Sequence, residues 1–176
     1  MSRPSTIDVS EVLDKNKISG FQVGVFLICG LCLIMDGFDV QALGYLAPAI
    51  IKDWQLSPAQ MGPVFSAALF GILFGSFLFS MIADKIGRRP VLIFATFFFA
   101  IVTLMAARTN DLTKLRTIRF IAGIGLGGIM PNAVTLVEEY TPHRLRVLMI
   151  LVVSNGFNLG AIVDGLISAW MVQDFG

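Results

Sequence analysis

The sequence predicts an all-α integral membrane protein with five transmembrane helices, and three observations support this class. Of the 176 residues, 56% are hydrophobic and only 14% are charged, whereas about one quarter of a soluble domain is charged. Five apolar runs each reach the length of about twenty residues that a helix needs to cross a bilayer. Because short polar connections separate these runs, a bundle of helices is favoured over a barrel.

The helices are expected at about 20–46, 60–82, 90–107, 116–137 and 147–171. The first carries no charge apart from Asp36 and Asp39, and the second lies within an uncharged run. Pro90 suits the first turn of the third helix. The fourth opens with Arg116 and Arg119, and the fifth follows the polar stretch TPHRLR.

Residues 1–19 are expected to form a polar tail at the cytoplasmic N-terminus. Val9, Val12 and Leu13 have helical spacing within it. A short amphipathic helix on the membrane surface and a plain disordered leader are both compatible with this pattern. The apolar run after the tail is too long for the core of a cleavable signal.

Lysine and arginine counts in the tail and connections predict the orientation. Eight such residues fall on one side of the membrane and four on the other. The positive-inside rule therefore places the N-terminus in the cytoplasm, as for a multi-pass protein of the inner (plasma) membrane. The larger set is Arg3, Lys15, Lys17, Lys85, Arg88, Arg89, Arg144 and Arg146, and the smaller set is Lys52, Arg108, Lys114 and Arg116.

Pairs of glycines mark where the helices are expected to touch. Gly71 with Gly75 and Gly123 with Gly127 each form a G-x-x-x-G motif. A third motif lies at 156–160. In lipid such pairs let two backbones approach closely, so we interpret them as packing surfaces.

Other motifs point to no enzyme, cofactor or metal. GIGLGG at 123–128 matches a dinucleotide fingerprint in letters but lacks the strand that must precede it. Cys29 and Cys32 have C-x-x-C spacing inside an apolar run, where thiols behave as small hydrophobes. His143 is interpreted as a loop residue, and a net charge of +1 argues against a nucleic-acid partner.

Asp36 and Asp39 are the residues that require a functional explanation. An ionised carboxylate near the bilayer centre costs about 2.5–3.5 kcal/mol on insertion scales. Spacing i, i+3 places both side chains on one helix face. We expect that face to look into protein or water and a carboxyl group there to gain and lose a proton. A structural ion pair with a neighbouring helix is the alternative.

Arg119 is the expected counterpart of these acids, because its guanidinium is a permanent cation whose planar fork suits a carboxylate. Its partner is expected to be Asp36, Asp39 or a bound substrate anion. Snorkelling to the outer interface is the alternative. If the chain consists of three-helix repeats, the first and fourth helices are equivalent, and both carry buried charge.

Several motifs together resemble the major facilitator superfamily. SMIADKIGRR at 80–89 is similar to the signature between helices two and three, with Ser80 in place of the usual glycine. Arg119 begins a match to the R-x-x-x-G pattern of helix four. Glu139 and Arg146 resemble the E-x₆-R pair at the cytoplasmic end of that helix.

Within that superfamily, two stretches resemble the aromatic acid:proton symporter branch. DGFD at 36–39 is similar to the motif in helix one of that branch, and the stretch 127–146 strengthens the match. The resemblance implies a twelve-helix carrier that works by alternating access. It favours the import of small carboxylic acids of the 4-hydroxybenzoate, benzoate or muconate type together with protons.

The resemblance also implies roles for individual residues. Asp36 and Asp39 would handle the proton and help shape the substrate site, and Arg119 would face the cavity as partner of an acid or of the substrate carboxylate. A cytoplasmic gate would consist of Asp84, Gly87, Arg88 and Arg89 with Glu139 and Arg146 nearby.

The length and one residue depart from the resemblance. Residues 20–176 would form a partial N-terminal bundle that lacks helix six and the C-terminal half, so a fragment, an abbreviated gene model and a truncated product are all open. A non-functional half-transporter and a carrier of another small organic solute, such as a dicarboxylate, are the alternatives. Asp164 takes a place where a small residue is expected, as an extra ionisable group or a sign of relaxed selection.

Overall fold

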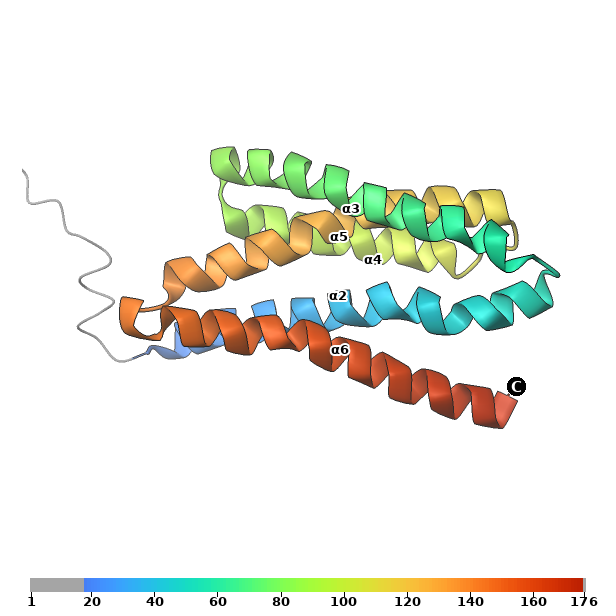
Figure 1. Cartoon of the computed structure of the whole chain (residues 1–176). Helices are drawn as coiled ribbons and strands as arrows, with labels where there is room; N and C mark the ends of the chain where they lie inside the picture. The colour runs from blue at the N-terminus through green and yellow to red at the C-terminus, as the bar shows by residue number, and fades with distance from the viewer. Residues whose placement is uncertain (1–17, 176) are drawn as a thin grey trace, which may run out of the picture.

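The computed structural model describes residues 18–175, with side chains for residues 18–171. Five helices in this part of the chain are long and apolar enough to span a bilayer, which confirms the predicted class (Figure 1). The expected N-terminal tail lies almost wholly outside the described residues. The elements are α2 (Gly20–Asp53), α3 (Pro58–Ile86), α4 (Arg88–Ala106), α5 (Leu112–Tyr140), the 3-10 turn η1 (His143–Leu145) and α6 (Arg146–Phe175).

Polar side chains determine where several helices begin. Ser19 and Gln22 form a capping box at α2, in which the Ser19 N–H donates to Gln22 Oε1 at 2.7 Å and the Gln22 N–H donates to Ser19 Oγ at 3.3 Å. Asp111 caps α5 by accepting from two backbone N–H groups. Between α3 and α4, Gly87 has φ 95°, a conformation that favours glycine. These polar caps belong in the headgroup layers of a membrane. The apolar runs of the sequence mark only the part of each helix that crosses the hydrocarbon core, so the helices can extend beyond those runs.

The helices form two groups (Figure 1). α3, α4 and α5 lie together on one side, and α2 and α6 lie together on the other. The most extensive contacts join α3 to α5 and α2 to α6, while α5 also contacts α2 and so connects the two groups. α5 is therefore the central helix of the described bundle.

Glycines account for the close contact between α3 and α5. Gly71 and Gly75 of α3 face Gly123 and Gly127 of α5. A Cβ atom added at any of these four positions would overlap backbone atoms of the opposite helix. Two of the three expected packing motifs thus meet each other, as small residues do where helices pack inside a membrane.

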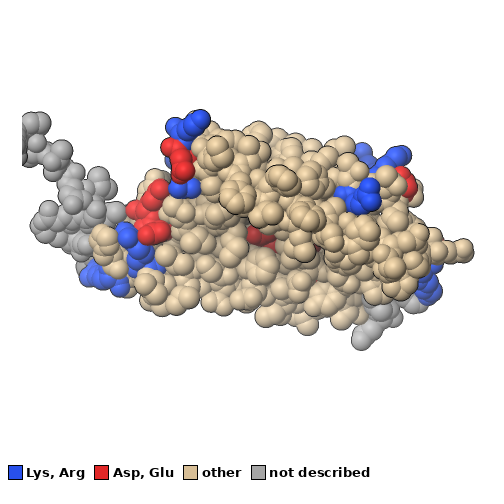
Figure 2. Space-filling view, turned by 45° about the horizontal axis from the view of Figure 1, so that its top comes forward, with Lys and Arg blue, Asp and Glu red and all other residues tan. Residues whose placement is uncertain are grey.

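The surface fits a protein surrounded by lipid. Large hydrophobic side chains such as Leu27, Phe94, Leu104 and Leu166 are exposed on the outer faces of the helices. On the face shown in Figure 2, the charged side chains gather at the two ends of the bundle, and the belt of uncharged residues between them is interrupted by one small acidic area. This pattern matches a bilayer whose polar layers contact the two ends.

Candidate functional site

The two acids of α2 point into the protein. Asp36 is 5% exposed and Asp39 is 8% exposed, although many neighbouring side chains on other faces of α2 are exposed. Gly37 lies between them and packs against the backbone of Phe157 in α6, so α6 closes one side of this region. The inward orientation is the one that a carrier requires, because carboxylates directed at acyl chains would be unpaired.

Asp39 forms an ion pair with Arg119 across the α2–α5 contact. Arg119 Nη1 donates to Asp39 Oδ2 at 3.0 Å, and both side chains are 11% exposed. Of the two acids that the sequence left open as partners, Asp39 is the one that contacts Arg119 in the structure. Arg119 Nε is buried and has no hydrogen-bond partner among the described residues, so one donor of the guanidinium is unused.

Asp36 has a different environment. It makes no ion pair within residues 18–171 and instead lines a cavity of about 610 Å³ between α2, α3, α5 and α6. Ser76, Thr135 and Phe157 are among the lining residues. The hydroxyl groups of Ser76 and Thr135 each donate to a carbonyl oxygen of their own helix, so they can only accept a further hydrogen bond. The rest of the lining is mostly hydrocarbon, as is usual for sites that bind small molecules.

The connection between α3 and α4 contains a short ion pair. Arg88 Nη2 donates to Asp84 Oδ1 at 2.7 Å across the turn at Gly87. Arg146 Nη1 lies 3.4 Å from Glu138 Oε1. The sequence pattern suggested Glu139 for that position, so the structure brings the neighbouring acid to Arg146. No ion pair joins these two groups within the described side chains.

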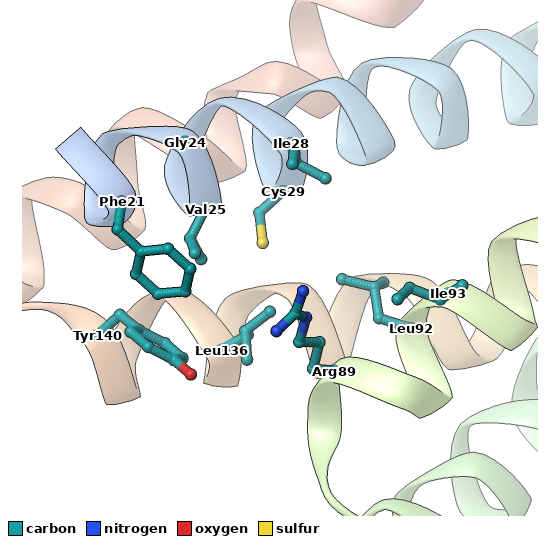
Figure 3. A pocket seen from close by; sticks show the side chains of 10 residues that line it. All are labelled: Phe21, Gly24, Val25, Ile28, Cys29, Arg89, Leu92, Ile93, Leu136 and Tyr140. Carbon is teal, nitrogen blue, oxygen red and sulfur yellow. The ribbon is translucent and has the colours of Figure 1, made fainter.

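Arg89 takes a separate position. It lines a cavity of about 310 Å³ between α2, α4 and α5, where its guanidinium points toward Cys29 (Figure 3). The remaining lining is apolar and includes Leu92, Leu136 and Tyr140. Cys29 is a free, buried thiol in this wall, which agrees with its interpretation as a small hydrophobic residue.

Sequence reasoning missed a link between the first and fourth spans at this end of the bundle. The Gln22 side chain donates to the Tyr140 carbonyl oxygen at 2.8 Å. The rings of Phe21 and Tyr140 lie 5.7 Å apart between centroids. The Ser19–Gln22 spacing signals a helix start, but only the three-dimensional contact shows that Gln22 also satisfies the end of α5.

Comparison with known proteins identifies the family. The model of the Major Facilitator Superfamily matches residues 29–176. The chain belongs to the Major Facilitator Superfamily. This superfamily assignment agrees with the five long apolar helices and with the buried charges on α2 and α5.

Individual relatives narrow the comparison. The chain is 41% identical over 170 residues to the 4-hydroxybenzoate transporter PcaK of Pseudomonas aeruginosa, a match that covers 97% of the chain and 38% of that protein. It is 39% identical over 170 residues to the gallate transporter of Pseudomonas putida, with 97% and 38% covered. It is 30% identical over 175 residues to the benzoate transport protein of Acinetobacter baylyi, again with 97% and 38% covered. The chain thus spans about two fifths of the length of these relatives.

Proposed function

We propose that this chain is the N-terminal part of a proton-coupled transporter that imports aromatic or related carboxylic acids. Support comes from relatives named as transporters of 4-hydroxybenzoate, gallate and benzoate. The observation that carries the proposal is the buried Asp39–Arg119 ion pair, together with Asp36 three residues earlier on α2 in the wall of a cavity. Arg119 does not line this cavity in the structure. Together these groups offer a permanent cation for a carboxylate and two acids for a proton.

The ion pair supplies a means of coupling. While Asp39 is ionised, it occupies Arg119 and neutralises it. When Asp39 takes up a proton, the attraction is lost and the guanidinium becomes available to a substrate carboxylate, which it can hold by two parallel hydrogen bonds. Binding of the proton and binding of the anion would then favour each other, because the positive charge of the proton and the negative charge of the carboxylate cancel within the site.

The cavity suits a small aromatic acid. At about 610 Å³ it falls within the usual range of about 300–1,000 Å³ for small-molecule sites. We propose that Phe157 contacts the ring of the substrate and that Ser76 and Thr135 accept hydrogen bonds from its hydroxyl substituents, since both side chains already donate to their own helices. A second half of the carrier would close the open side of this cavity, because carrier sites lie between repeats at the midplane.

The same proposal includes the place and orientation of the protein. We infer an inner (plasma) membrane location with the N-terminus in the cytoplasm, from the eight Lys and Arg residues on that side against four on the other. Asp84, Gly87, Arg88 and Arg89, with Glu139 and Arg146, would then form the cytoplasmic gate. We include Glu138 in this proposed set because its carboxylate lies 3.4 Å from Arg146.

Uptake of labelled 4-hydroxybenzoate by cells that express the complete gene tests the function. Asp39→Asn should abolish accumulation, because the amide keeps the size of the side chain but cannot ionise and so cannot carry a proton between the two sides of the membrane. Asp53→Asn, at the exposed end of α2, is the matched control and should leave uptake intact. Full accumulation by Asp39→Asn would refute the coupling role.

Substrate competition and expression tests separate the alternatives. An excess of unlabelled benzoate should reduce uptake, whereas a saturated dicarboxylate should not. The reverse result would favour a dicarboxylate carrier on the same fold. A half-transporter without activity is favoured instead if the gene ends at Gly176 and the chain alone takes up no acid.

A further inference from the structure

A third buried carboxyl group, that of Asp164, lies in the contact between α2 and α6. One turn before it, Gly160 packs so closely on α2 that a Cβ atom would overlap the carbonyl oxygen of Ile34. Directly after it, Gly165 lies against Tyr45, whose hydroxyl is 3.1 Å from the position that a Cβ would take. Asp164 is enclosed between these two contacts and is only 3% exposed.

Its surroundings do not satisfy an ionised carboxylate. Asp164 Oδ2 is buried and has no hydrogen-bond partner among the described residues. Ser168, one turn further along α6, is a hydrogen-bonding neighbour of the carboxyl group. A carboxylate in such an apolar contact requires a paired cation or several donors, so a single hydroxyl is insufficient.

Arg119 is the one basic side chain that the described parts of α2, α5 and α6 place near Asp39 and Asp164. The titratable groups of α2 in this region are Asp36, Asp39 and Tyr45, and Asp39 is near enough to Asp164 to interact with it electrostatically. On α5 the cation is Arg119, which is already paired with Asp39. Asp36 faces the cavity, so Asp39 and Asp164 share one positive charge and need one proton to make this part of the bundle neutral.

We propose that Asp164 binds a proton and exchanges it with Asp39. In this proposal Asp39 starts as the carboxylate that is paired with Arg119, and Asp164 starts as the carboxylic acid. On exchange, the O–H bond of Asp164 breaks and one forms on Asp39, while the negative charge passes to Asp164. The summed charge of the three groups is unchanged, so the exchange adds no net charge to the membrane interior.

This inference adds a second proton site to the proposed transporter and rests on the proposed function only for the use made of the proton. The chemistry of binding concerns α2, α5 and α6 alone, all of which the chain contains. Infrared spectroscopy of the full chain in nanodiscs tests it without any substrate. A negative infrared result would refute the proton site at Asp164 without bearing on substrate uptake. A negative uptake result would refute the proposed transport function without bearing on the proton site.

The measurement follows the C=O stretching band of protonated carboxyl groups in an Asp36→Asn background, which removes the acid that lines the cavity. We expect a protonated band at neutral pH that disappears in Asp36→Asn/Asp164→Asn. Asp36→Asn/Asp53→Asn, which alters an exposed acid instead, should retain the band. An undiminished band after Asp164→Asn would overturn the proposal.

A second variant covers a loss of folding in the asparagine substitution. Asp164→Glu keeps an acid in the contact but changes its length and hydrogen bonding, so the frequency of the band should shift while circular dichroism stays helical. A band at the original frequency in Asp164→Glu would assign the proton to another residue and overturn the proposal.

Discussion

Removal of either member of the Asp39–Arg119 ion pair should destabilise the bundle strongly. The paired atoms are 3.0 Å apart, which corresponds to an attraction of about 5–6 kcal/mol at an effective dielectric constant of about 20. The net effect is smaller because both groups lose hydration when buried. Truncation of one partner of such a pair nonetheless lowers the free energy of unfolding by about 3–5 kcal/mol, since the other charge is left uncompensated.

A double-mutant cycle isolates this interaction. Unfolding of the chain by dodecyl sulfate in mixed micelles would be compared for Asp39→Asn, Arg119→Gln and the double variant. We expect the double variant to lose less stability than the sum of the two single losses, by at least about 2 kcal/mol, because both charges are then absent.

The exposed pair Asp84–Arg88 is the internal control for this cycle. Its atoms are closer, at 2.7 Å, but the Asp84 side chain is 66% exposed. Solvent screening limits such a pair to about 0–1 kcal/mol. Additive losses for Asp39→Asn and Arg119→Gln, of the same size as those at the control pair, would refute the view that the buried pair joins α2 to α5.

Three further predictions concern packing, capping and access. Gly37→Ala should lower the free energy of unfolding by about 1–3 kcal/mol, because the methyl group would overlap α6, whereas Gly44→Ala, which meets nothing within 4 Å, should be neutral or slightly stabilising. Gln22→Ala should lower it by about 1–2 kcal/mol in the same assay, since it removes a capping bond and the bond to the last turn of α5. In a cysteine-free background, a charged maleimide should label Ser76→Cys in the cavity faster than Leu69→Cys on the apolar surface, and equal rates would contradict an aqueous cavity.

The sequence alone was sufficient for the helix faces but not for their partners. Spacing i, i+3 placed Asp36 and Asp39 on one face, and the structure finds both buried. Three partners were open for Arg119, because the register between α2 and α5 depends on packing that spacing within one helix does not determine. Only the relative placement of the two helices distinguishes Asp39, at 3.0 Å, from Asp36.

A spacing pattern also does not decide which of two adjacent residues makes a contact. Glu138 and Glu139 differ by about 100° around α5, so a match to a pattern of spacing does not decide which of them reaches Arg146. The structure places Glu138 there. Likewise, Asp164 follows Gly156 and Gly160 at intervals of four residues and so shares a face of α6 with them. This spacing does not show that Asp164 lies near Asp39, because that depends on how closely Gly160 lets α6 approach α2.

The buried ion pair occupies the place where a change of charge would have the largest mechanical effect. Glycines hold α3 against α5 and α2 against α6 at backbone contact, so we expect each pair of helices to move as a unit. α2 and α5 touch less extensively, and the Asp39–Arg119 bond crosses that contact. Protonation of Asp39 removes the attraction there and leaves both tight pairs intact. We therefore expect the contact between α2 and α5 to weaken first when Asp39 is protonated. The pair α2–α6 could then move relative to the pair α3–α5.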